Sequence, residues 1–251
     1  MISNRLLLND DKTEFLLIGT RQQLNKVESI PLIVGAMDIE PISCVRSLGA
    51  WFDSTLSMGT HINKVCKSGF YYLHNLRKIR KYLSQDCLST LIHAFITSRL
   101  DYCNSLMYGL PQRQISKLQR LQNAAARLAL DLSKFCHITP ALRQLHWLPV
   151  VKRIQFKILL LTFKSIHGLS PPYISELNTV KPKTSYSLRS NNSTLLQYPQ
   201  QKLLSTLGAR SFASAAPSLW NKLPADIRNV TSLNEFKKMI KTFLFNVELY
   251  S

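Results

Sequence analysis

The sequence predicts an α+β fold, in which a small mixed β/α segment precedes a helical bundle and a helical C-terminal region. Up to about residue 57, short β-branched and apolar runs are interrupted by Gly and Pro, which is typical of short strands and turns. From His61 onward, apolar residues recur at spacings of three and four, which is typical of amphipathic helices. We therefore expect three regions, with boundaries at 1–57, 58–135 and 136–251.

The N-terminal region is predicted to contain several short strands. Residues 13–20, TEFLLIGT, form an apolar run that ends in glycine, and they predict a buried strand. Residues 30–58 are rich in β-branched residues and are interrupted by Gly35, Pro41 and Gly49, so we expect further strands and turns there.

The middle region is predicted to be a bundle of three helices joined by short connections. The second helix would start after Ser84, a good N-cap residue, and the third after the YGLP sequence that ends at Pro111. The apolar faces comprise Ile62, Val65, Leu73, Leu76, Ile79 and Leu83, then Leu88, Leu91, Ile92, Phe95 and Ile96, then Ile115, Leu118, Leu121, Ala125 and Leu128.

Helices are also predicted in the C-terminal region. Thr139 followed by Pro140 is typical of a helix start, and Pro149 can open a long helix that ends at Gly168. Residues 178–206 are rich in Ser, Thr, Asn and Gln and predict a polar connector. Ser232 and Glu235 fit a capping box for a last helix.

The positive charge is concentrated in the middle of the chain. The formal net charge is +18, and residues 61–167 hold 17 Lys and Arg against only Asp86, Asp101 and Asp131. Residues 1–60 have a net charge of −2, and residues 168–251 have +6. Such an excess indicates a polyanionic partner, which is either nucleic acid or an anionic membrane surface.

Membrane insertion and secretion find little support in the sequence. Apolar runs such as ILLL at 158–161 are far shorter than the roughly 20 residues of a spanning helix, and the first residues do not form a signal peptide. The five cysteines are scattered without a C-x-x-C pair, so we expect reduced thiols rather than disulfides. We expect an intracellular protein, nuclear or cytoplasmic, that is not secreted and does not bind membranes.

Motifs for the common hydrolase and nucleotide-binding sites are absent from the sequence. There is no G-x-S-x-G, H-E-x-x-H, G-x-G-x-x-G or G-K-[ST], and the histidines and cysteines have no zinc-ligand spacing. Asp10 and Asp11 are adjacent carboxylates of the kind that hold metals in polymerases. A two-metal site, however, draws on at least two segments, and only nine residues precede Asp10. The NDDK sequence therefore favours a polar turn over a metal site.

Several segments resemble, in order, the end of the palm, the thumb and the C-terminal region of reverse transcriptases from non-LTR (LINE-type, jockey-like) retrotransposons. The resemblance covers essentially the whole chain, and its segments are LNDDKTEFLLIGT, VRSLGAWFDSTLSMGTHINKV, LIHAFITSRLDYCNSLMYGLP, LQRLQNAAARLAL, LHWLPVVKRIQFKILLLTFK and FASAAPSLWNKLP.

The resemblance implies RNA-directed DNA polymerase as the family activity, but an inactive chain here. The family's metal-binding aspartates, one pair of them in an aromatic-x-Asp-Asp turn, would fall upstream of Met1, as would its endonuclease domain. Asp10 and Asp11 lack the aromatic neighbour and would follow the catalytic strands. We therefore expect a truncated reading frame that begins inside the palm and binds no cofactor. Mg²⁺ would be needed only by the full-length enzyme.

The resemblance also implies roles for individual residues. Lys12 would act as an auxiliary general acid toward pyrophosphate, although a solvated turn lysine is the alternative. Leu48, Gly49 and Ala50 would form a primer-grip turn, in which Gly49 lets backbone approach the primer, although it can serve only a tight turn. Trp147 and Trp220 are expected to anchor cores. The basic residues that would follow the template–primer phosphates are Lys64, Lys67, Arg77, Lys78, Arg80, Lys81, Lys117, Arg120 and Arg127.

Three functions remain open from the sequence. The leading one is a reverse transcriptase fragment that binds nucleic acid through its basic thumb, mainly electrostatically and without sequence preference. The second is a host-retained module for protein interaction or structure. The third is an unstable pseudogene product, whose uncovered apolar surface around 13–34 would promote self-association through the palm segment.

Overall fold

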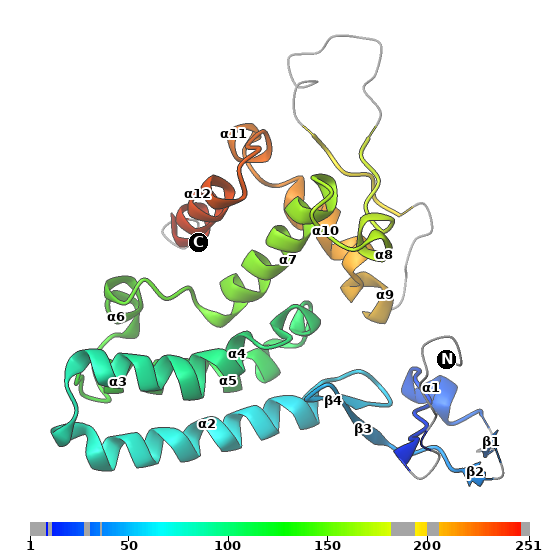
Figure 1. Cartoon of the computed structure of the whole chain (residues 1–251), viewed down its shortest axis with the longest axis horizontal. Coiled ribbons are helices and arrows are strands. Elements are labelled where there is room, and N and C mark those ends of the chain that lie inside the picture. Colours follow the sequence, from blue (N-terminus) through cyan, green and yellow to red (C-terminus); the bar gives the residue numbers. More distant parts are fainter. Residues whose placement is uncertain are drawn as a thin grey trace. The chain divides into compact units, whose positions relative to one another are not determined.

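The computed structural model describes residues 9, 12–27, 31–35, 37–181, 194–199 and 206–246 of the chain (Figure 1). They form two compact units, Met1–Val65 and Cys66–Ser251. The first unit contains two small antiparallel sheets and the second is helical, so the α+β prediction is confirmed. The division lies inside a helix, at Val65 rather than at residue 57, and the second unit is not divided again at 135.

The first unit is built from two β-hairpins and one short helix. Strands β1 (Leu32–Val34) and β2 (Met37–Ile39) pair with each other, as do β3 (Cys44–Ser47) and β4 (Ala50–Asp53). Helix α1 (Arg21–Leu24) starts with a capping box, in which Thr20 Oγ1 accepts a hydrogen bond from the Gln23 amide.

The buried strand predicted at 13–20 is wrong. This segment contributes only an isolated bridge between Phe15 and Pro41, and Ile18 is 51% exposed. Proline has no N–H to donate, so a ladder that reaches Pro41 loses a hydrogen bond there and does not extend. The backbone is held instead by single bonds, such as the one from the Gly19 amide to the Ser54 carbonyl at 3.0 Å.

The second unit is helical, and the periodic segments of the sequence form helices where they were expected. Within the described part of the chain, no helix is both long and apolar enough to cross a membrane. The helices are α2 (Gly59–Ile79, which spans the division), η3 (Arg80–Tyr82), α3 (Gln85–Ile92), η4 (His93–Thr97), α4 (Ser98–Asp101), η5 (Asn104–Met107), α5 (Gln112–Ala129), α6 (Ile138–Gln144), α7 (Val150–Ile166), α8 (Pro172–Ser175), α9 (Thr206–Arg210), α10 (Phe212–Trp220), α11 (Ala225–Arg228) and α12 (Leu233–Asn246).

Most predicted helix ends are confirmed. Ser84 caps α3 by accepting a hydrogen bond from the Cys87 amide, α7 follows Pro149, and Gly168 (φ +67°) follows the C-terminus of α7. The start predicted at Thr139 is wrong, because α6 already begins at Ile138. Pro140 then lies in the first turn, where the N–H that proline lacks has no partner inside the helix.

The C-terminal helices close around a core that also holds part of the predicted connector. Trp220 is fully buried there with Phe163 and Phe236, and Trp147 is buried elsewhere in the unit, so their prediction as core anchors is confirmed. Trp220 Nε1 donates to the Thr194 carbonyl at 2.8 Å, and Leu196 is fully buried. The connector is thus anchored at 194–199, while 182–193 and 200–205 lie outside the described residues.

Helices α2 and α5 approach closely at one glycine. A Cβ atom added to Gly69 would lie 2.5 Å from Cδ2 of Leu121, which is fully buried. Glycine in a helix normally costs stability relative to alanine, so its presence here is explained by this close approach.

We predict that Gly69→Ala destabilises the chain by about 1 kcal/mol, because overpacking at Leu121 outweighs the gain in helix propensity. Urea unfolding measures this change. In a double-mutant cycle, Leu121→Val should offset part of the loss, because the two positions are in contact. A stabilising effect of Gly69→Ala alone would contradict the close approach.

A buried histidine makes the stability of the first unit depend on pH. His61 is 3% exposed, its Nε2 has no hydrogen-bond partner among the described residues, and burial lowers its pKa below the usual 6.5. As pH falls below about 6.5, the unfolded chain takes up a proton more readily than the folded chain. The contribution of neutral His61 to stability is therefore present above this pH and lost below it.

We predict that His61→Leu flattens the dependence of the unfolding free energy on pH between about pH 7 and pH 5, because leucine does not titrate. Urea unfolding at several pH values measures the slope. Leucine also removes an unsatisfied buried polar atom, so the variant should be more stable at the acidic end. An unchanged slope would contradict this assignment to His61.

Candidate nucleic-acid interface

A groove lined mainly by basic side chains lies between the C-terminal ends of α2 and α5 in the second unit. Its volume is about 580 Å³. Six of the side chains that line it are cationic and one, Asp131, is a carboxylate, so the groove carries a large excess of positive charge. The lining residues are Arg77, Lys78, Arg80, Lys81, Ala124, Arg127, Leu128, Asp131, Leu132 and Lys134.

The two sides of the groove are formed by the ends of helices. The last turn of α2 and the 3₁₀ turn η3 supply the first side. On the other side, α5 ends in a Schellman turn, in which Asp131 has φ +54° and the Leu132 amide donates to the Arg127 carbonyl at 2.9 Å. Asp tolerates this left-handed conformation better than most residues. The turn directs the chain so that Lys134 also lines the groove.

Two arginines of the groove are partly buried, and each makes one long hydrogen bond within the chain. Arg80 Nη2 donates to Gln85 Oε1 at 3.5 Å, and Arg127 Nη2 donates to the Cys136 carbonyl at 3.3 Å. The Nε atoms of both arginines are buried and have no partner among the described residues. Most of their N–H donors therefore remain available, and the planar guanidinium group can bind a phosphate oxyanion with two of them.

The structure brings together five of the nine basic residues predicted to bind nucleic acid: Arg77, Lys78, Arg80, Lys81 and Arg127. Lys67, Lys117 and Arg120 lie elsewhere on α2 and α5. Lys64 belongs to the first unit, where its Nζ lies 5.3 Å from the centre of the Trp51 ring.

Three residues were missed from the sequence: Lys134, which lines the groove, and Tyr82 and Phe135, whose rings lie next to lining lysines. The Tyr82 and Phe135 side chains are 76% and 85% exposed. Each ring lies under the ammonium group of the preceding lysine, with Nζ 4.9 Å from the ring centre in both cases. In the sequence, each ring is marked only by the lysine that precedes it, in the pairs Lys81–Tyr82 and Lys134–Phe135. The fold then brings both lysines into the lining of one groove.

The residues around the paired aspartates are described only in part. Asp10 and Asp11 lie outside the described residues. Asn9 accepts hydrogen bonds from the Lys12 amide at its side chain (3.2 Å) and from Thr13 Oγ1 at its carbonyl (2.9 Å), which is typical of an Asn-initiated turn. Lys12 is exposed, and its role as a general acid stays a prediction. Among the described residues, no three His, Cys, Asp or Glu side chains are grouped to hold a metal.

The predicted primer-grip residues form the tip of the β3–β4 hairpin. Leu48 (φ +45°) and Gly49 (φ +84°) make a two-residue turn, and Ala50, buried, starts β4. Positive φ at both positions is typical of a type I′ turn, which glycine accepts readily and leucine does not. The tight turn by itself accounts for Gly49. The Leu48 side chain is 91% exposed, and contact with a primer stays a prediction.

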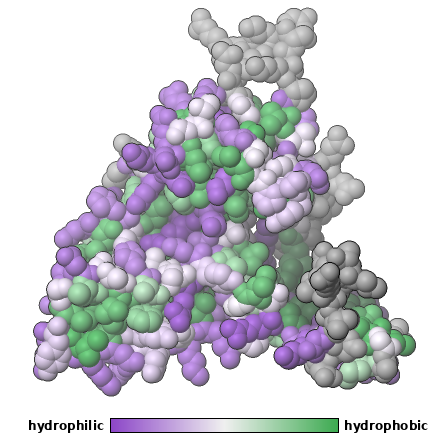
Figure 2. Space-filling model, viewed as in Figure 1, coloured by the Kyte–Doolittle hydropathy of each residue, from purple (hydrophilic) through white to green (hydrophobic). Residues whose placement is uncertain are grey.

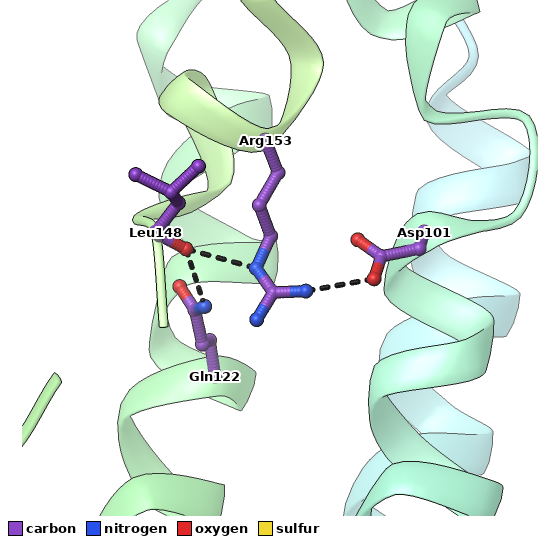
Figure 3. Close-up of polar contacts among 4 residues, drawn as sticks. All are labelled: Asp101, Gln122, Leu148 and Arg153. Carbon is purple, nitrogen blue, oxygen red and sulfur yellow. Dashed lines mark hydrogen bonds and ion pairs between the residues drawn. The ribbon is translucent and has the colours of Figure 1, made fainter. Parts of the chain in front are cut away.

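A second polar site joins three helices of the same unit (Figure 3). The Leu148 carbonyl accepts hydrogen bonds from Gln122 Nε2 and from Arg153 Nε, both at 2.8 Å, and Arg153 Nη1 forms an ion pair with Asp101 Oδ2 at 2.7 Å. Gln122 is 1% exposed and the Arg153 side chain is 13% exposed. Because this arginine already has a carboxylate partner, the cavity of about 310 Å³ beside it is a weaker candidate for polyanions than the basic groove.

These features define the class: an α+β protein, mostly helical, with a basic groove between helix ends. Comparisons of the chain with protein families, with curated proteins and with solved structures found no match.

We predict that Arg153→Lys destabilises the chain by about 2 kcal/mol. The guanidinium group of Arg153 bonds the Leu148 carbonyl and the Asp101 carboxylate at the same time, and a single ammonium group cannot reproduce this geometry. Hydrogen bonds to charged groups contribute about 1.5–3 kcal/mol. Urea unfolding measures the change. Asp101→Asn should cost less, because that side chain is 43% exposed. Equal stability of Arg153→Lys and the parent chain would contradict this role for Arg153.

Proposed function

We propose that this chain binds nucleic acid without sequence preference, through phosphate contacts in the basic groove. The observation that carries the proposal is the gathering of six cationic side chains and one carboxylate on one concave surface. Like charges that are gathered on one surface repel one another and destabilise the fold. Phosphates of a polyanion relieve this repulsion, and their binding releases counterions, which favours association. Phosphate contacts position a protein on nucleic acid but carry no sequence information.

The resemblance to non-LTR reverse transcriptases supports the proposal and extends it. In that family the helices after the palm bind the template–primer. The segments that carry the resemblance include the start of α2, up to Val65, and most of α5 with Arg127, which lines the groove. We propose that the chain corresponds to the end of the palm, the thumb and the C-terminal region of such an enzyme. On this proposal it does not extend a primer by itself, and primer extension on an RNA template with Mg²⁺ tests that directly.

A second proposed property is self-association through the first unit. Several apolar side chains there are exposed. The most exposed in the β1–β2 hairpin is Ile33 at 74%, and Leu32 and Met37 are 46% and 44% exposed. Hydrophobic surface on this unit is visible in Figure 2. Exposed apolar surface on short edge strands favours association with another polypeptide. The dependence of the sedimentation coefficient on protein concentration tests this proposal.

We predict that replacing Arg77, Lys78 and Lys81 together by glutamine weakens binding of a labelled oligonucleotide and reduces its salt dependence. Three lost phosphate contacts should make the slope of log K against log[salt] shallower by about 2 for a single strand. Fluorescence anisotropy at several salt concentrations measures the slope. All three side chains are exposed, so the fold should be retained.

The matched control removes the same charge elsewhere on the second unit: Lys181, Lys222 and Lys238, all exposed, are replaced by glutamine. This variant should retain nearly the parent slope. Asp131→Asn removes the carboxylate of the groove and should strengthen binding. Equal losses in the two triple variants, or an affinity of the parent chain that does not change between about 50 and 200 mM salt, would contradict binding at the groove.

A further inference from the structure

On each of the two sides of the basic groove, an exposed aromatic ring directly follows a lysine that lines the groove. Tyr82 ends the η3 turn on the α2 side, and Phe135 lies in the turn that follows α5. Their neighbours Lys81 and Lys134 both line the groove. Each lysine Nζ lies 4.9 Å from the ring centre of the next residue, so both rings adjoin the positively charged surface.

The exposure of these rings is not explained by packing within the chain. Their exposed fractions, 76% and 85%, are among the highest of any large apolar or aromatic side chain in the described residues. Exposed aromatic rings gain free energy when a flat, weakly hydrated partner covers them. A nucleobase is such a partner, and aromatic rings beside a basic groove are the usual elements of sites that bind single-stranded nucleic acid.

The two rings would add little to the binding of a duplex, whose phosphates can still contact the groove. In a double helix the faces of the bases are already stacked on one another, and only their edges and the phosphates are accessible. In a single strand a base can turn out of the stack and lie on a protein ring. The two rings therefore favour single-stranded over double-stranded nucleic acid. The lysines and arginines do not make this distinction, because both forms carry phosphates.

We propose that the groove is a site for single-stranded nucleic acid, in which Tyr82 and Phe135 each stack on a base while the six cationic side chains hold the intervening phosphates. This inference rests on the proposed function and adds the strand class and the two stacking residues. Stacking is tolerant of sequence because every base has a π face, which agrees with binding that has no sequence preference.

The test compares three ligands of about 16 nucleotides: a single strand, the same strand annealed to its complement, and an abasic single strand with the same phosphates and no bases. The parent chain should bind the single strand more tightly than the abasic strand. In the double variant Tyr82→Ala, Phe135→Ala, binding of the single strand should fall about tenfold for each ring, and the preference over the abasic strand should disappear. Binding of the duplex should change less than about twofold.

Two controls separate stacking from loss of fold or of charge. Tyr173→Ala with Tyr198→Ala removes two exposed rings (68% and 54%) whose neighbours in sequence do not line the groove, and it should leave all three affinities unchanged. Tyr82→Phe with Phe135→Tyr keeps both rings and should retain the parent preference. Phe135→Trp adds an indole whose emission should be quenched by the single strand but not by the abasic strand.

The outcomes distinguish this inference from the proposed function. Salt-dependent binding that is equal for the single and the abasic strands, and unaffected by loss of the rings, would overturn the stacking proposal and leave the phosphate contacts in place. Absence of binding to every ligand at low salt would overturn the proposed function itself. A loss of duplex affinity as large as that of single-strand affinity would also overturn the assignment to single strands.

Discussion

The architecture of the second unit depends on the carbonyl of Leu148. This oxygen lies before Pro149, at the head of α7, and accepts hydrogen bonds from α5 through Gln122 and from Arg153 of α7 itself, which also pairs with Asp101 of α4 (Figure 3). The start of α7 is thereby fixed against two other helices. Further along, α7 contacts α10 and α12, and Phe163 enters the core around Trp220 (Figure 1). This partly buried polar network therefore sets the position of the helix that joins the bundle to the C-terminal core.

The basic groove combines helix stability with a surface for polyanions. Five of its six cations, all except Lys134, lie in the last turns of α2 and α5 and in η3. At helix C-termini, carbonyl groups and the helix dipole favour positive charge by about 0.3–1 kcal/mol for each residue. Helix ends can hold such residues in any protein. The basic groove differs because two such helix ends lie side by side in it, so the positive potential of both adds up on one surface. Arg80 and Arg127 also make hydrogen bonds there, to Gln85 and to the Cys136 carbonyl.

The candidate site was predictable only in part. The excess of Lys and Arg in residues 61–167 can be counted from the sequence. Five of the groove residues were also among those expected from the helical pattern and the resemblance. Which cations share a surface depends on how α2 and α5 pack, and helical periodicity says nothing about that packing. Lys134, Tyr82 and Phe135 lie in turns, where no period links side-chain direction to sequence. Trp147 and Trp220 are buried, as their prediction as core anchors required, and the exposed rings next to the groove lysines are the smaller ones of Tyr82 and Phe135.

The sequence by itself determined the helices and most of their ends, because apolar spacing, Ser84, Pro149 and Gly168 act locally through backbone geometry and capping. It also determined the sign and the region of the charge. Only the tertiary structure decided the rest. Residues 13–20 lack a continuous strand partner and so do not form the predicted strand. The polar connector is anchored because Asn221 Oδ1 accepts a hydrogen bond from the Leu196 amide and Trp220 Nε1 donates one to the Thr194 carbonyl. Strand pairing, cavity filling and the meeting of two helix ends all require partners that are distant in sequence, and no local pattern specifies them.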